Sequence, residues 1–431
     1  MSTQLEPVLP PSLEDFGFPL CLVFSKQGEA YLSERITGRL WQIDHEKYRL
    51  IKTFSIVPLV GHHETGLLGI ALDPDFEKKR YIYCYFTAGT SQKDFKNRVV
   101  RVKDDGKEEI LLDNIPAGMI HNGGIIAFAP DKTLYIGVGV QDEIKEKAQD
   151  TKWLGGKVLR INRDGSIPKD NPFSNSPVYS YGHRNIFGLA FHPKTGKLYI
   201  SDVGPEKNDE INIIEKGSNY GWPDVMGMSE NKRFINPIQT YDPTITPTQN
   251  VFVGNDLYFA SFNEGSVHKL TFSGKNYDQV EKDEVVYKGK PWGANGVFYG
   301  PDEQFYVTTQ DKIIRFTPEK VINPIIKAAK QGLNFPLHFI EGHLETSTKS
   351  IKDLKLGEGA IVEVQGQKVA AYKKSEKETI TLSPVCKHMG CIVGWNDKDK
   401  TWDCPCHGSR YAKEGKVIQG PAEKDLDKKT F

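Results

Sequence analysis

The 431-residue sequence predicts an all-β protein: a six-bladed β-propeller, a short helical linker and a second, small β domain. Two observations support this prediction. A strand–turn–strand pattern returns six times before residue 320, and two loops near the C-terminus carry cysteine and histidine at short spacing. Helical periodicity replaces the repeat between these regions. We therefore expect a propeller over residues 1–320, a linker over 321–353 and a small β domain that carries the two loops over 354–431.

The repeated unit consists of an apolar strand, a turn that often contains Pro-Asp, and a strand rich in aromatic residues. Its six copies include the segments LVFS, IALDPD, IIAFAPD, GLAFHP, FVGN and GVFYGPD. Repeats of about 50 residues with little helix between them are typical of β-propeller blades. A pair of β-sandwiches is the alternative fold. A sandwich does not require the same strand–turn–strand signature in every unit, so the propeller is favoured.

The linker and the last domain are recognised by a change of pattern. The segment from 321 is amphipathic and helix-like, with breaks at Gly332 and Pro336. Short strand-like runs (AIVEV, KVAAY and ITLSP) then resume after residue 354. These runs predict the small β domain that presents the two loops.

Composition excludes several classes of protein. Fifty-six basic residues balance fifty-six acidic ones, so no nucleic-acid partner is indicated. No apolar run reaches the length of a membrane span, and the first residues lack the basic and apolar parts of a signal peptide. We therefore expect a cytoplasmic protein without a transmembrane segment. Cys21 and Cys84 lie in apolar, strand-like runs and are expected to be buried thiols.

The two C-terminal loops carry the strongest chemical signal in the chain. The first has Cys386, His388 and Cys391, and the second has Cys404, Cys406 and His407. Each supplies one cysteine and one histidine, which suits a two-iron cluster with two thiolates on one iron and two imidazoles on the other. A tetrahedral zinc site is the alternative. It gives no role to the spare cysteine in each loop or to the hydroxyls of Ser409 and Tyr411.

These loops resemble those of Rieske [2Fe–2S] domains. The resemblance implies that Cys386 and Cys404 bind one iron, that His388 and His407 bind the other, and that Cys391 and Cys406 form a disulfide. It also implies that the Ser409 and Tyr411 hydroxyls tune the cluster through hydrogen bonds to sulfur. Such bonds and the imidazole ligands stabilise the reduced cluster, so a high reduction potential is expected.

Residues 15–317 resemble the soluble quinoprotein sugar dehydrogenases, the glucose/sorbosone dehydrogenase family that uses pyrroloquinoline quinone (PQQ). The similarity lies in Gly- and His-rich segments such as His-Asn-Gly-Gly at His121 and Gly-His-Arg-Asn at Arg184. It implies that His121 is the general base that takes the substrate hydroxyl proton. It implies that Arg184, with Asn185 beside it, stabilises charge on the quinone oxygen, and that Glu64 lies next to the cofactor.

The same resemblance implies two calcium positions. The backbone carbonyls of Gly204 and Pro205 match the site of a cofactor-linked calcium ion, which prefers oxygen ligands. Glu210 and Tyr220 match a second, structural calcium position. Both assignments rest on the resemblance alone.

The sequence departs from the family at three places where basic residues usually contact the cofactor. Ile125, Asn263 and the segment Gly293-Ala294-Asn295 stand at these positions. The leading interpretation is an oxidoreductase that oxidises a sugar or small alcohol at a quinone site and passes electrons through the [2Fe–2S] cluster to an external one-electron acceptor. The alternative is a Rieske electron-transfer protein whose propeller no longer binds PQQ and serves as a docking module.

Overall fold

The computed structural model describes residues 9, 12–13, 16–44, 47–57, 64–91, 94–103, 105–317, 350–364, 367–387, 392–404, 409–420, 422 and 424–429. The chain forms two compact units, Met1–Pro318 and Glu319–Phe431. Most of the predicted linker lies outside the described residues. Its described end holds a short 3₁₀ helix, η2 (Ile351–Asp353).

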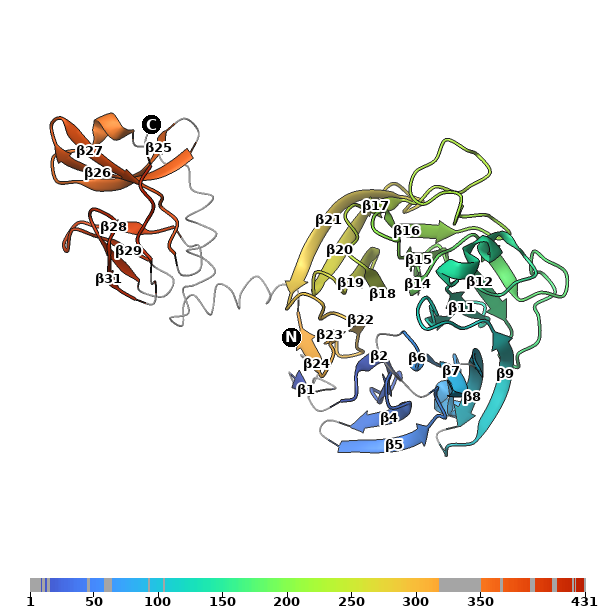
Figure 1. The fold of residues 1–431 in the computed structure, drawn as a ribbon. Helices are drawn as coiled ribbons and strands as arrows, with labels where there is room; N and C mark the ends of the chain where they lie inside the picture. The colour runs from blue at the N-terminus through green and yellow to red at the C-terminus, as the bar shows by residue number, and fades with distance from the viewer. Residues whose placement is uncertain are drawn as a thin grey trace. The chain divides into compact units, whose positions relative to one another are not determined.

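The first unit contains six four-stranded antiparallel sheets arranged in a ring, as the repeats predict (Figure 1). The first three sheets are β2 (Pro19–Phe24), β3 (Ala30–Glu34), β4 (Arg39–Asp44) and β5 (Lys47–Thr53); β6 (Leu67–Leu72), β7 (Tyr81–Ser91), β8 (Asp94–Lys103) and β9 (Glu108–Ile115); and β10 (Ile126–Phe128), β11 (Leu134–Val138), β12 (Lys157–Ile161) and β13 (Val178–Tyr181). The other three are β14 (Ile186–Phe191), β15 (Leu198–Asp202), β16 (Asp209–Ile214) and β17 (Gln239–Tyr241); β18 (Pro247–Val253), β19 (Asp256–Ser261), β20 (Ser266–Ser273) and β21 (Gln279–Lys288); and β22 (Gly296–Tyr299), β23 (Phe305–Thr308), β24 (Ile313–Phe316) and β1. Each repeat found in the sequence corresponds to the two innermost strands of one sheet. The fold is therefore the predicted propeller.

The ring is closed by a strand that the repeat pattern did not reveal. Strand β1 (Ser12–Leu13) pairs antiparallel with β24, with Ser12 opposite Ile314 and Leu13 opposite Ile313. The N-terminal segment thereby completes the sheet formed by the last repeat. This pairing joins the two ends of the propeller sequence and so closes the ring.

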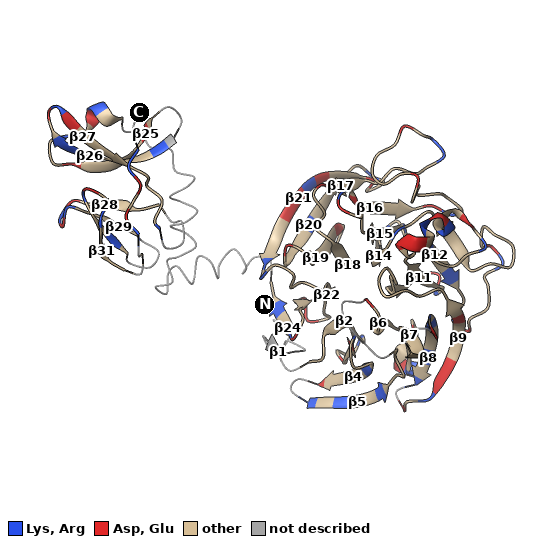
Figure 2. Ribbon diagram, viewed as in Figure 1, with Lys and Arg blue, Asp and Glu red and all other residues tan. Residues whose placement is uncertain are grey.

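Polarity explains which strand of each sheet lies at the centre. The innermost strands β2, β6, β10, β14, β18 and β22 contain no charged residue. The outer strands β5, β9 and β21 carry several, and their colours mark the rim in Figure 2. Burial of the apolar strands between neighbouring sheets is the main favourable term for this arrangement.

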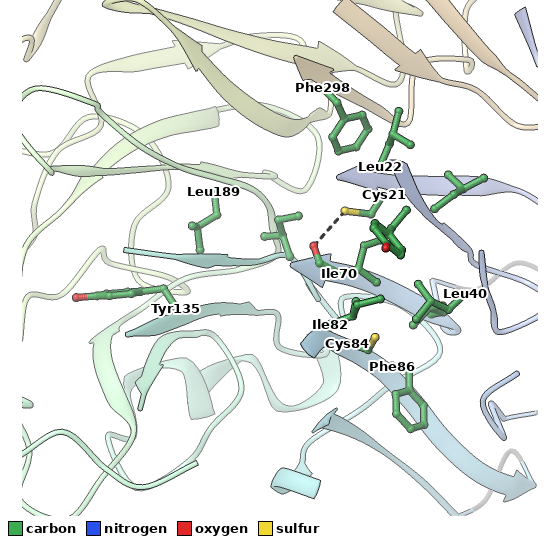
Figure 3. Close-up of a cluster of buried hydrophobic side chains, with 14 of the residues drawn as sticks. Cys21, Leu22, Leu40, Ile70, Ile82, Cys84, Phe86, Tyr135, Leu189 and Phe298 are labelled. Carbon is green, nitrogen blue, oxygen red and sulfur yellow. Dashed lines mark hydrogen bonds between the residues drawn. The ribbon is translucent and has the colours of Figure 1, made fainter. Parts of the chain in front are cut away.

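The core between the sheets includes both predicted buried thiols. Cys21 is 3% exposed and Cys84 is fully buried. Figure 3 shows them among Leu22, Ile70 and Phe298, with the Cys21 thiol donating to the Ile70 carbonyl at 3.6 Å. The prediction that these cysteines are packed in the core is confirmed.

Irregular pairing occurs where the innermost strands begin. The register of β2, β6, β14 and β18 against the next strand shifts within the first residues of each. Such bulges reorient side chains and often lie next to functional sites. Those in β6 and β14 lie beside the loops that carry Glu64, Arg184 and Asn185.

The second unit consists of two small antiparallel sheets. One contains β25 (Gly359–Val364), β26 (Gln367–Ser375) and β27 (Glu378–Leu382); the other contains β28 (Gly394–Asn396), β29 (Thr401–Asp403), β30 (Arg410–Ala412) and β31 (Val417–Gln419). Its core is centred on Trp402 and Tyr411, both fully buried. The first unit has only short helical segments among its described residues, α1 (Phe76–Lys79) and η1 (Asp142–Gln149). Within the described part of the chain, no helix has the length and apolarity needed to cross a bilayer.

Candidate functional site

A cavity of about 420 Å³ lies at the centre of the ring of sheets. Every innermost strand, or the residue just before it, contributes to the lining through Leu20, Leu68, Ile125, Phe187, Thr248 and Phe298. The volume lies within the range of small-molecule sites, which are usually apolar with a few polar groups. This cavity is therefore the place to look for a cofactor and substrate site.

Loops that precede three consecutive innermost strands bring four predicted residues together. Glu64 precedes β6, His121 precedes β10, and Arg184 and Asn185 precede β14. One carboxylate oxygen of Glu64 accepts hydrogen bonds from the His121 backbone N–H at 2.7 Å and from the Asn185 side chain at 3.1 Å. Glu64 also lines the cavity, so it links the cavity to this cluster.

His121 and Arg184 are in direct contact. An Nη2 hydrogen of Arg184 points to Nε2 of His121 at 3.1 Å, and the two residues are only 5% and 6% exposed. Because a guanidinium only donates, Nε2 must carry the lone pair in this arrangement. His121 also has φ of +57°, an unusual conformation for a residue with a side chain and one that occurs often at functional sites.

The electrostatic setting keeps the His121 imidazole neutral. Burial and the positive charge of Arg184 lower the pKa of His121, while Glu64 and Asp142 act in the opposite direction. An Asp142 carboxylate oxygen lies 3.7 Å from His121 Nδ1, and the other lies 3.6 Å from Arg184 Nη2. A neutral imidazole with its lone pair on Nε2 has the form that a general base needs, once a substrate hydroxyl takes the place of the Arg184 hydrogen bond.

Two acidic residues of this cluster were not predicted. Asp142 begins η1, shortly after the apolar strand β11. Asp202 ends β15, is 1% exposed, and accepts hydrogen bonds from the backbone N–H groups of Arg184 and Asn185. In both cases the available sequence signal was an acidic residue near the end of an apolar strand. Such a residue does not show which side chains it will contact in the folded protein.

The predicted calcium positions contain oxygen groups that already have partners. Arg184 Nη1 donates to the Gly204 carbonyl at 3.1 Å, so a cation at that oxygen would share it with a guanidinium.

At the second calcium position, Glu210 is 2% exposed. Its burial, together with the nearby negative charge of Asp202, raises the pKa of Glu210 to about 8. The Tyr220 hydroxyl donates to the Ile213 carbonyl and accepts from Glu215 N–H. Pro205 is exposed beside Gly204. No group of three or more metal-binding side chains occurs among the described residues, and both calcium sites stay predictions.

Two of the three departures from the family pattern face the central cavity. Ile125 and Asn295 both belong to its lining. The Asn295 amide donates hydrogen bonds to the backbone carbonyls of Pro19 and Thr309 at 3.2 and 2.6 Å, so its hydrogens are used within the protein. The Asn263 amide likewise donates to the Thr244 carbonyl at 3.1 Å. These positions supply no positive charge to the cavity.

Half of the predicted cluster ligands are described in the second unit. Cys386 and Cys404 are 2% and 3% exposed and belong to one core cluster. The Tyr411 hydroxyl lies 3.1 Å from the Cys386 sulfur and accepts a hydrogen bond from Lys387 N–H, whereas the Ser409 hydroxyl accepts one from Ala422 N–H. The remaining predicted ligands and the predicted disulfide lie outside the described residues: His388, Cys391, Cys406 and His407.

A ring of six sheets with a polar cluster beside its central cavity defines a propeller of the kind found in sugar dehydrogenases. The model of the Glucose / Sorbosone dehydrogenase family matches residues 16–316, and that of the Rieske [2Fe-2S] domain matches residues 346–430. The chain belongs to the glucose/sorbosone dehydrogenase family and carries a C-terminal Rieske domain. Together, the two domains fit an oxidoreductase.

Several known proteins are similar to this chain. The uncharacterized protein slr1608 of Synechocystis sp. is 30% identical over 69% of this chain and 83% of its own length. A putative oxidoreductase (glucose dehydrogenase) from Thermus thermophilus is 33% identical, with a TM-score of 0.64 over 70% of this chain and 98% of that one. The PQQ-bound form of aldose sugar dehydrogenase from Streptomyces coelicolor is 28% identical, with a TM-score of 0.62 over 72% and 96%.

The Rieske domain implies a [2Fe–2S] cluster, and the PQQ-bound relative supports PQQ as a candidate cofactor of the propeller. The described residues fit both groups. Cys386 and Cys404 place two buried thiols within one core, with a hydroxyl at one of them. In the propeller, the cavity volume suits a quinone, and Glu64 in its lining joins the cavity to the contact between His121 and Arg184, which do not line it themselves.

Proposed function

We propose that this protein oxidises a sugar or small alcohol in the propeller and delivers the electrons, one at a time, through the Rieske cluster to an external acceptor. Oxidation of an alcohol releases two electrons, and a [2Fe–2S] cluster carries one. PQQ, when bound, would supply the two-electron acceptor for the hydride of the alcohol carbon. The presence of both domains in one chain supports this division of the chemistry.

The observation that carries the proposal is the contact between His121 and Arg184. In the proposed reaction, Nε2 of His121 takes the proton of the substrate hydroxyl. Arg184 stabilises negative charge that develops on an oxygen beside it, because its guanidinium is held inside a buried site. Glu64 accepts hydrogen bonds from the His121 backbone and the Asn185 amide and so holds these residues in fixed positions relative to one another.

The experiment uses the full chain supplied with PQQ and calcium under anaerobic conditions. Addition of an aldose is expected to reduce an artificial dye acceptor and to produce the electron paramagnetic resonance signal of a reduced Rieske cluster. His121→Gln should lower the rate of dye reduction by about 100-fold or more, the usual effect of losing a positioned general base. His268→Gln is the matched control, because His268 lies on β20 and pairs with Glu264 and Asp283, outside the cluster of Glu64, His121 and Arg184.

A second substitution separates the two domains. Cys386→Ser should remove the cluster signal while PQQ-dependent dye reduction continues. Absence of aldose-dependent dye reduction in the loaded wild-type protein would contradict the enzymatic proposal. Dye reduction without any reduction of the cluster would contradict only the internal electron transfer.

One observation favours a second candidate, in which the propeller no longer binds PQQ and is a binding module that docks a partner to the Rieske electron carrier. Ile125 and Asn295 leave the cavity without positive charge at positions where the family usually has it. In that case, calorimetry with PQQ at tens of micromolar and calcium present would show no binding. Measured PQQ binding would exclude this candidate.

A further inference from the structure

A buried histidine next to the candidate site joins a serine and an aspartate in a hydrogen-bonded chain. His183 Nδ1 lies 3.2 Å from an Asp202 carboxylate oxygen, and its Nε2 lies 2.9 Å from the Ser180 hydroxyl. The order is that of a Ser–His–Asp catalytic triad, but Ser180 and His183 are fully buried and neither lines the central cavity. A nucleophilic serine needs access to its substrate, so this chain of side chains is not a hydrolase site.

The orientation of the His183 ring follows from its partners. A carboxylate only accepts hydrogen bonds, so Nδ1 carries the hydrogen of the contact with Asp202 and donates it. Burial lowers the pKa of His183 and favours the neutral imidazole, in which Nε2 accepts from the Ser180 hydroxyl. The ring also stacks on Tyr220, with centroids 4.6 Å apart and an angle of 24° between the planes. Both nitrogens and one face of the imidazole are therefore held in place.

Asp202 connects this histidine to the residues beside the cavity. Its carboxylate is 1% exposed and accepts hydrogen bonds from the backbone N–H of Asn185 at 2.7 Å and of Arg184 at 3.2 Å. Among the described residues, His183 is the one side chain that donates to Asp202. The hydrogen bonds of a buried carboxylate orient it, because little water competes for its lone pairs. Loss of the His183 donor would therefore let the carboxylate turn away from the backbone N–H groups that it holds.

The residues that Asp202 holds are those that contact the other loops of the candidate site. Arg184 Nη2 lies 3.1 Å from His121 Nε2. The Asn185 amide donates to a Glu64 carboxylate oxygen at 3.1 Å. A shift of the backbone at Arg184 would change both contacts, and a misplacement of about 1 Å can lower the rate of an enzyme about 100-fold.

We propose that His183 is a positioning residue, which holds Arg184 against His121 through the hydrogen bond from Nδ1 to Asp202. The consequence for the reaction rests on the proposed function, whereas the consequence for the geometry is independent of any cofactor. His183 does not line the cavity, so it acts through Asp202. The hydrogen bond of Nδ1, and not that of Nε2, therefore decides the effect of a substitution at residue 183.

Substitutions at residue 183 can separate the two nitrogens. His183→Asn keeps an amide N–H close to the position of Nδ1, whereas His183→Gln keeps one close to the position of Nε2. Both variants lose the ring that stacks on Tyr220, so their melting temperatures should be similar. Asp202→Asn keeps the volume of the carboxylate and removes its charge, which provides an independent way to release Arg184.

His192→Gln is the matched control for the loss of a buried imidazole. His192 is fully buried, and its ring packs on Tyr277 with centroids 4.2 Å apart. Its Nδ1 accepts hydrogen bonds from the backbone N–H groups of Lys194 and Thr195, outside the candidate site.

The first measurement is the pKa of His121 in the full chain without cofactor, by NMR titration of protein with ¹⁵N-labelled histidine. Burial and the positive charge of Arg184 both lower this pKa, so displacement of Arg184 should raise it. We expect a raised pKa in His183→Gln and in Asp202→Asn. We expect the pKa of the wild type in His183→Asn and in His192→Gln.

The second measurement is kcat for dye reduction by the full chain with PQQ, calcium and an aldose. His183→Gln should lower kcat by about tenfold or more, and His183→Asn should stay within about threefold of the wild type. Equal changes in these two variants would refute the role of Nδ1, because the missing ring would then be the cause.

Two other results have separate meanings. An unchanged His121 pKa and an unchanged kcat in both His183→Gln and Asp202→Asn would refute the positioning role and leave the proposed function standing. Absence of aldose oxidation by the loaded wild-type protein would refute the proposed function. The titration of His121 would still decide whether His183 positions Arg184.

Discussion

Replacement of Tyr411 by Phe tests the cluster domain at one atom. The Tyr411 hydroxyl lies 3.1 Å from the Cys386 sulfur and accepts a hydrogen bond from the Lys387 amide at 3.1 Å. Because the amide occupies an oxygen lone pair, the hydroxyl hydrogen is left to point towards sulfur. A hydrogen bond to a ligand sulfur stabilises the reduced cluster more than the oxidised one, since reduction adds negative charge.

The size of the effect follows from the strength of this bond. Hydrogen bonds to charged groups contribute about 1.5–3 kcal/mol, and only the difference between the two redox states changes the potential. If roughly half of that, about 0.8–1.5 kcal/mol, is differential, the potential falls by about 30–65 mV for a one-electron couple. Tyr411→Phe should therefore lower the midpoint potential by this amount, with the cluster retained.

The assay is a redox titration followed by electron paramagnetic resonance or circular dichroism. Tyr372→Phe is the control, because Tyr372 lies in the same core, packs on Trp395 at 5.3 Å, and has no hydrogen bond to a cysteine among the described residues. A potential that changes by less than about 10 mV in Tyr411→Phe, with an intact cluster signal, would show that the hydroxyl does not act on the cluster.

Three further predictions concern the propeller. Asp142→Asn removes a carboxylate that raises the pKa of His121, so that pKa should fall. The acid limb of the pH–rate profile should then move to lower pH. A shift to higher pH would contradict the geometry. Burial alone would lower the pKa of His268, but hydrogen bonds to Asp283 and Glu264 raise that pKa overall. The protonated His268 therefore stabilises the folded protein below the pKa of the unfolded state, and this stabilisation is lost as the pH rises through the pKa of the folded state. His268→Gln should therefore lower the melting temperature more at pH 6 than at pH 9, and equal losses would refute the argument. Burial raises the pKa of Cys21 to about 12 and that of Cys84 well above its usual value, so both thiols should resist alkylation until the protein unfolds; mass spectrometry showing rapid native labelling would disprove this.

The predicted fold depended on patterns that are local in the sequence. The strand–turn–strand repeat is set by alternating polarity and by turn residues, so it predicted the two innermost strands of all six sheets. The pairing of β1 with β24 was not predicted. It joins two short segments from opposite ends of the propeller sequence, and no local pattern marks such a pair.

For the candidate site, too, the sequence indicated some residues and only the structure revealed others. Short motifs indicated His121 and Arg184, because glycine-rich loops with polar residues are rare in a core. They did not indicate Asp142 or Asp202, which meet those residues only after separate loops converge. Nor did they indicate Arg35, the one cationic side chain among the described residues that line the cavity.

The sequence by itself determined the two domains and the all-β fold, and it predicted the ligands of the cluster. Each of these depends on composition, periodicity or the spacing of neighbouring residues. Only the tertiary structure decided the tautomer of His121, the partners of Glu64 and the source of positive charge in the cavity. The physical reason is that hydrogen bonds and electrostatic interactions depend on distances between atoms of different sheets, and those distances exist only once the ring has closed.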